Sequence, residues 1–74
     1  MADTTLECTG LACPMPIVKM TTAMKTMEAG DTLTVTADDP GFEPDVQAWT
    51  EARGHTLESL TEADGVYTAV IKLA

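Results

Sequence analysis

The sequence predicts an α+β fold, a two-layer α/β sandwich in which two helices cover one face of a four-stranded mixed sheet, in the order βαβαββ. Three observations predict it. Apolar residues recur with helical spacing in two segments, they alternate with polar residues in others, and turn signals separate these segments. A chain of 74 residues is too short to cover both faces of such a sheet. We therefore expect residues 1–74 to form a single domain.

The first predicted strand runs from Thr4 to Cys8 and ends at a Thr-Gly turn signal. The stretch LACPMP then leads into the first predicted helix. Its apolar face follows i, i+3, i+7 and i+10 spacing at Ile17, Met20, Met24 and Met27. Gly30 supplies the expected stop signal beyond the end of the helix.

The stretch DTLTVTADD alternates between apolar and polar residues and predicts a half-buried strand. Its inner side is formed by Leu33, Val35 and Ala37. The loop signal DDPG follows, and Glu43 to Arg53 is predicted to form the second helix. Pro44 suits the first turn of that helix, and Gly54 closes it.

The segment from Thr56 to Leu73 predicts a β-hairpin. Leu57 and Leu60 mark its first strand, and the stretch EADGV contains an Asp-Gly turn. The second strand is predicted from the alternation of Tyr67, Ala69, Ile71 and Leu73.

Charge limits the classes of partner. Twelve acidic and four basic residues give a formal charge of −8, which repels phosphate backbones and anionic membrane surfaces. We therefore expect no direct nucleic-acid or membrane partner, and we expect a protein partner to present a basic patch. The N-terminal stretch MADTTLEC has no export signal, so we expect a cytoplasmic protein whose two cysteines are reduced.

Cys13 is the candidate nucleophile, because it directly precedes Pro14 at the expected start of the first helix. Unpaired backbone N–H groups and the positive end of the helix dipole favour a thiolate there and lower its pKa below the usual value. We expect Pro14 and Pro16 to fix the direction of the sulfur and Gly10 to leave it approachable. The plain alternative is that Cys13 is a small buried hydrophobic residue.

The stretch LECTGLACPMPIVK resembles the signature of the TusA/SirA-type sulfur carrier family, in which Gly-x-x-Cys-Pro-x-Pro opens the first helix. AGDTLTVTADDP and DVQAWTEARGHTL are similar to later parts of that family. The resemblance implies a βαβαββ sandwich that carries sulfur as a persulfide on the motif cysteine, here Cys13. It also implies that a cysteine desulfurase or a rhodanese donates the sulfur. DsrE-type proteins would accept it, for tRNA thiolation, cofactor synthesis or sulfur oxidation.

The chain departs from the family pattern at three positions before the motif cysteine. Ala12 stands where a basic residue is common, Glu7 replaces an aspartate, and Cys8 has no required counterpart. Cys8 opens an alternative, a redox or regulatory dithiol protein that cycles a Cys8–Cys13 disulfide, although an inward-facing strand residue explains it as well. A third alternative is an interaction module in which Cys13 has no chemical role.

Met15 and Lys19 are candidate partner contacts, with a solvated helix flank as the plain alternative for Lys19. We expect no cofactor and no metal, because two cysteines and His55 fall short of the four ligands that zinc takes. One acidic cluster is interpreted as turn and helix-start residues rather than as an acid/base pair. Its members are Asp38, Asp39, Glu43 and Asp45.

Overall fold

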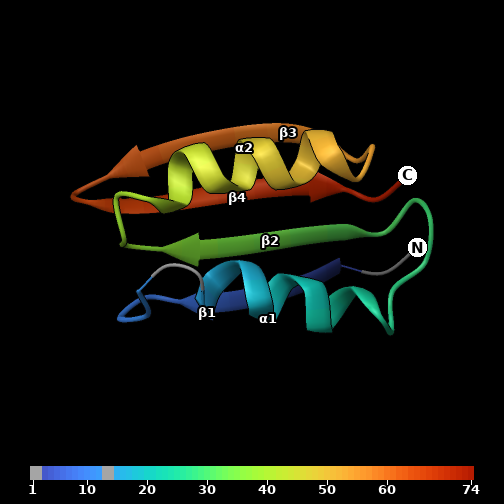
Figure 1. Ribbon diagram of the computed structural model, residues 1–74, viewed down its shortest axis with the longest axis horizontal. Coiled ribbons are helices and arrows are strands. Elements are labelled where there is room, and N and C mark those ends of the chain that lie inside the picture. Colours follow the sequence, from blue (N-terminus) through green and yellow to red (C-terminus); the bar gives the residue numbers. More distant parts are fainter. Residues whose placement is uncertain (1–2, 13–14) are drawn as a thin grey trace.

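The computed structural model describes residues 3–12 and 15–74 and confirms the predicted βαβαββ order (Figure 1). The strands are β1 (Asp3–Cys8), β2 (Thr32–Ala37), β3 (Thr56–Ala63) and β4 (Val66–Lys72). The helices are α1 (Met15–Met24) and α2 (Phe42–Ala52).

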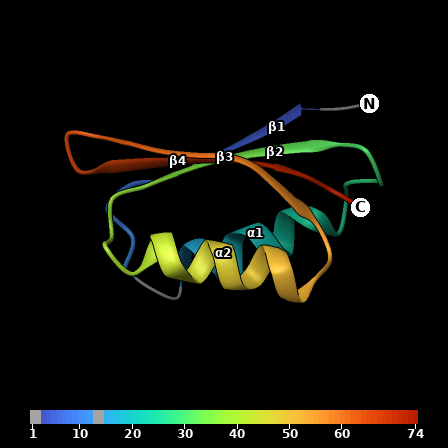
Figure 2. The ribbon, with the colours of Figure 1, turned by 90° about the horizontal axis from the view of Figure 1, so that it is seen from above.

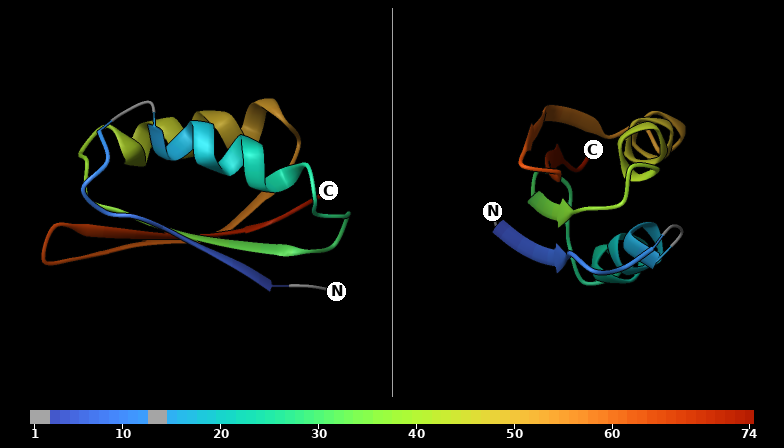
Figure 3. Two further views of the ribbon diagram at one scale, coloured as in Figure 1. Left: turned by 90° about the horizontal axis from the view of Figure 1, so that it is seen from below. Right: turned by 90° about the vertical axis from the view of Figure 1, so that its left-hand side faces the viewer.

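The four strands form one mixed sheet in the order β1-β2-β4-β3. β1 is parallel to β2, and β4 is antiparallel to both β2 and β3. Figures 2 and 3 show that both helices lie on the same face of this sheet, as predicted. Because β1 and β2 are parallel, their carboxyl ends lie side by side, with Cys8 opposite Ala37.

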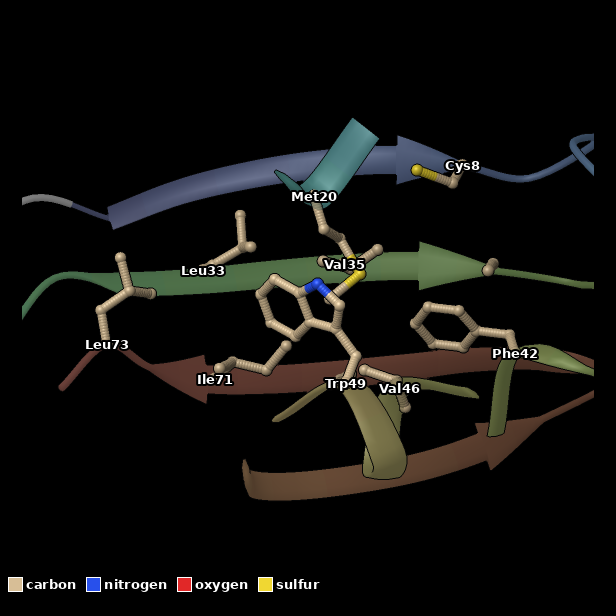
Figure 4. Close-up of a cluster of buried hydrophobic side chains, with 11 residues drawn as sticks. Cys8, Met20, Leu33, Val35, Phe42, Val46, Trp49, Ile71 and Leu73 are labelled. Carbon is tan, nitrogen blue, oxygen red and sulfur yellow. The ribbon is translucent and has the colours of Figure 1, made fainter. Parts of the chain in front are cut away.

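The core lies between the sheet and the two helices (Figure 4). Alternate residues of β2 and β4 point into it, and Met20 of α1 packs against them with no exposed surface. Trp49 of α2 is 8% exposed, and its indole N–H donates to the Thr21 hydroxyl of α1 at 3.3 Å. The two helices are therefore joined by a polar contact as well as by packing. Phe42, which the periodicity analysis did not single out, is also buried.

Helix α1 ends earlier than predicted. It stops at Met24, whereas the apolar spacing extended to Met27. The next three backbone N–H groups, those of residues 25, 26 and 27, bond to carbonyls three residues back, so the chain tightens into turns instead of continuing the helix. Met27 still packs against the core from this turn, which explains why its spacing matched the helix.

The predicted hairpin is confirmed. Asp64 and Gly65 adopt φ values of 53° and 81°, the left-handed conformations that a two-residue hairpin turn of this type requires. The register of β3 on β4 shifts between Leu57 and Ser59. This irregularity brings Leu57 opposite Ile71 and Leu60 opposite Ala69, so two leucines three residues apart both pack on the core.

The sheet face opposite the helices is polar along β2. On its inner strand β2, the residues that alternate with the buried ones are all threonines, and Thr68 of β4 lies beside Thr36. Within residues 3–12 and 15–74, neither helix is long and apolar enough to span a membrane.

Candidate functional site

The candidate site lies at the end of the sheet where the carboxyl ends of β1 and β2 meet. The loop after each strand turns toward the helix layer, and α1 and α2 begin at Met15 and Phe42 near this same end (Figure 2). The N-terminal end of a helix carries partial positive charge. The N-terminal ends of both helices therefore lie at one end of a strongly acidic protein.

A hydrogen bond joins the two loops. Gly10 adopts a φ of 82°, which favours glycine, and its N–H donates to the Asp38 carboxylate at 3.0 Å. The preceding turn is closed by the Leu11 N–H, which donates to the Cys8 carbonyl at 3.2 Å. Sequence reasoning selected Gly10 and Asp38 separately and missed their contact, because only the parallel pairing of β1 and β2 brings them together.

A shallow hollow of about 300 Å³ lies between the loops. Its lining comes from both, namely Gly10, Leu11, Ala12, Asp38, Asp39 and Pro40. Asp39 fixes the second loop, since its carboxylate accepts the Gly41 N–H at 3.1 Å and its carbonyl accepts the Phe42 N–H at 2.9 Å. The prediction that the acidic residues organise the turn is confirmed for Asp39, whereas Asp38 bonds to the other loop. The helix N-cap itself is Gly41 and makes no side-chain capping bond.

Cys13 and Pro14 lie outside the described residues. They join Ala12, which lines the hollow, to Met15, which begins α1. The Met15 N–H donates to the Ala12 carbonyl at 2.9 Å, so the described residues on either side of Cys13 and Pro14 are held together.

The start of α1 differs electrostatically from the sequence expectation. Pro16 has no N–H group, and the Met15 N–H is already bonded to Ala12. Neither Met15 nor Pro16 therefore offers a free N–H to an anion, while the dipole of α1 still favours negative charge at its start. Pro16 is fully buried, which anchors the start of α1 in the core.

The two candidate partner contacts on α1 both lie at the surface. Met15 is 44% exposed, and Lys19, one turn further along, is also exposed. Val18 is 46% exposed and was missed, although an apolar residue beside the core-facing Ile17 is a usable signal in the sequence.

Cys8 is fully buried at the end of β1. Burial raises the pKa of its thiol above the ordinary value of 9.0, while the positive charge of Lys19 acts in the opposite direction. A buried, protonated thiol is a poor nucleophile. This environment weighs against the dithiol alternative.

His55 lies at the other end of the sheet, where β3 begins. Its Nδ1 accepts the Ala74 N–H at 3.0 Å, and its ring centroid lies 5.6 Å from that of Trp49. In the part of the chain that the structure describes, no three His, Cys, Asp or Glu side chains gather into a metal-binding group.

Comparison with known proteins identifies the family and supports the fold. The family model described as "Sulfurtransferase TusA" matches residues 4–73. The crystal structure of a SirA-like protein from Desulfitobacterium hafniense superposes with a TM-score of 0.80 at 29% identity, and the match covers 97% of this chain and 96% of that one.

Two relatives are each named as a proposed sulfur carrier protein. The one from Neisseria meningitidis serogroup A is 43% identical over 72 residues, covering 97% of both chains. The one from Aquifex aeolicus is 42% identical over 72 residues, which are 97% of this chain but only 36% of that longer protein.

Proposed function

Because this chain belongs to the sulfurtransferase TusA family, we propose that it performs sulfur carriage through a persulfide on Cys13. The sulfur carrier role follows from the family, and the assignment to Cys13 is the proposed part. The observation that carries this assignment is the pair of flanking residues. Ala12 lines the open hollow, and Met15 begins α1 while bonded to Ala12. The described residues on either side of Cys13 and Pro14 are therefore both exposed.

The proposed step is a thiolate exchange. The Cys13 thiolate attacks the terminal sulfur of the donor's persulfide, a new S–S bond forms, and the donor's S–S bond breaks. The electron pair of the broken bond leaves with the donor cysteine as a thiolate, and the terminal sulfur keeps its proton. Delivery to an acceptor thiolate repeats the exchange in the other direction. No external oxidant or reductant is consumed.

Local charge supports this chemistry. The dipole of α1 favours negative charge at the start of the helix, which lowers the free energy of a thiolate or a persulfide anion relative to its protonated form. The ten residues of α1 include Lys19 and no acidic residue, so this helix adds no opposing charge.

Sulfur carriage requires protein partners, which supply and receive the sulfur. We assign the donor role to a cysteine desulfurase or a rhodanese and the acceptor role to DsrE-type proteins. The charge of −8 suits basic patches on those partners. Met15 and Lys19 are exposed on the helix that follows Cys13, and we place them in the contact surface.

A reducing compartment suits this function, because the thiolate must stay free until a donor arrives. We therefore place the protein in the cytoplasm and take residues 1–74 as one carrier domain. Fully buried Cys8 is a structural residue in this proposal.

Intact mass spectrometry without reductant tests the assignment. After incubation with a cysteine desulfurase and cysteine, or with a rhodanese and thiosulfate, we expect the wild-type protein to gain one sulfur atom. The gain should map to the Cys13 peptide and be absent from Cys13→Ser. A sulfur atom on the Cys8 peptide, or a mass loss that corresponds to a Cys8–Cys13 disulfide, would contradict the proposal.

A further inference from the structure

Two exposed apolar side chains lie in the first turns of α1, the helix that follows Cys13 in the chain. Among the described residues, the large hydrophobic side chains left exposed are Met15 and Val18, at 44% and 46%. They lie three residues apart on α1, so they occupy the same face of the helix. Exposed apolar side chains that gather in one place mark an interaction surface more often than isolated ones do.

This surface continues into a groove of about 330 Å³ between α1 and β1. Its walls come from Leu6 of β1 and from Val18, Lys19, Thr22 and Ala23 of α1. Carbon dominates the lining, because three of these residues are apolar and Lys19 contributes its aliphatic stem. The groove is large enough to receive an apolar side chain from another protein.

Two further features indicate what kind of segment fits. β1 is an edge strand, so one row of its backbone N–H and C=O groups has no neighbouring strand. An extended segment can lie along such an edge. Lys19 is the charged residue of the groove, and within the described ranges no carboxylate forms an ion pair with it. α1 itself contains no acidic residue, although the chain has twelve.

We propose that this groove binds an extended segment of the protein that donates sulfur to Cys13, with an apolar side chain against Val18 and Leu6 and a carboxylate near Lys19. The inference rests on the proposed function of Cys13. It adds that donor recognition has two parts. Basic groups of the donor face the acidic hollow, and an apolar segment with one acid occupies the non-acidic flank of α1.

A second copy of this chain is a poorer occupant than a donor. Two chains of charge −8 repel each other, and self-association would bring that charge together. A donor segment suffers no such penalty, and Val18 of the groove lies one turn from Met15, which begins α1 two positions after Cys13.

The test compares Val18→Glu with a matched control, Ala48→Glu, which adds the same charge at an exposed position on α2. A third variant, Val18→Ser, removes the apolar side chain without adding charge. Each variant is loaded by two routes. One is a donor protein, either a rhodanese with thiosulfate or a cysteine desulfurase with cysteine, and the other is polysulfide, which needs no docking surface. Circular dichroism and thermal unfolding confirm the fold of each variant.

We expect Val18→Glu to raise the KM for loading by the donor protein about tenfold, because one buried valine contributes about that factor to binding. Val18→Ser should raise it in the same direction. Ala48→Glu with either donor, and Val18→Ser with polysulfide, should stay within about twofold of wild type, the change that a few tenths of a kcal/mol produces. A wild-type KM for Val18→Glu overturns the docking proposal. So does a wild-type protein that gains sulfur from polysulfide but from neither donor protein. A dimer in sedimentation that Val18→Glu dissolves also overturns it. If the wild-type protein gains no sulfur on Cys13 by any route, the proposed function itself fails.

Discussion

The backbone N–H of Gly10 donates a hydrogen bond to the carboxylate of Asp38 at 3.0 Å, which ties the loop after β1 to the loop after β2. The two residues are 28 positions apart in the chain. The first of these loops leads directly to Cys13. The bond therefore restrains the segment that presents the proposed nucleophile.

Removing this restraint should weaken both the fold and the reaction. We expect Asp38→Ala to lower the free energy of unfolding by about 1 kcal/mol, the usual net contribution of one hydrogen bond, and to slow loading of Cys13 by polysulfide. Asp38→Asn removes the same charge but keeps an acceptor oxygen, so it should behave more like wild type. Urea unfolding and the loading rate measure the two effects. Equal behaviour of the Ala and Asn variants would show that the bond is unimportant.

The contact between Trp49 and Thr21 should couple the two helices. Trp49→Phe keeps an aromatic ring in the core but removes the indole N–H that donates to Thr21 at 3.3 Å. Combined with Thr21→Val in a double-mutant cycle, it should give a coupling energy of about 0.5–1.5 kcal/mol in urea unfolding. Additive effects of the two substitutions would mean that packing alone joins the helices.

The buried thiol of Cys8 predicts a loss of stability at alkaline pH. Burial raises the pKa of Cys8 in the folded state above its ordinary value of 9.0, so the unfolded chain releases this proton first. The contribution of Cys8 to stability is therefore constant below that value and falls as pH rises through 9 toward the folded-state pKa. In a Cys13→Ser background, urea unfolding between pH 7 and pH 10.5, about 1.5 units past the ordinary thiol value, should show a steeper decline with Cys8 present than with Cys8→Ala. Parallel curves for the two proteins would contradict this account of Cys8.

Salt should affect docking to a donor protein and loading by polysulfide in opposite directions. The charge of −8 attracts the basic patch expected on a donor. Salt screens this attraction, because the Debye length falls from about 10 Å at 0.1 M salt to about 3 Å at 1 M. We expect the KM for a donor protein to rise over this range. Loading by polysulfide, which is itself an anion, should become faster as salt weakens repulsion. A KM that stays constant or falls with salt would argue against a basic docking patch.

Much of the fold was predictable because local signals agreed with one another. The alternation of Leu33, Val35 and Ala37 and the turn at Asp64 and Gly65 depend on backbone period and on left-handed φ values, which are encoded within a few residues. The end of α1 was not predictable in this way. Met27 matches the helical spacing but reaches the core from a turn, so an apolar pattern alone does not distinguish the two conformations.

The candidate site was predictable only in part. The Cys-Pro-x-Pro motif identifies Cys13 from the sequence, but the partners of its loop depend on strand order. The meeting of Gly10 with Asp38 requires β1 and β2 to be parallel neighbours, which no local pattern specifies. The exposure of Val18 likewise depends on how α1 is rotated over the sheet, and on its place over the edge strand β1.

The central claim is that Cys13 receives sulfur and passes it on. The most direct measurement follows one sulfur atom through both transfers. The protein is loaded by a donor, separated from it, and mixed with a DsrE-type acceptor in its reduced form, and peptide mass spectrometry follows both proteins over time. We predict that one sulfur atom leaves the Cys13 peptide and appears on an acceptor cysteine in equal amount, with Cys8→Ala behaving as wild type. Sulfur that never reaches the Cys13 peptide, or that stays there while the acceptor remains unmodified, would contradict the account.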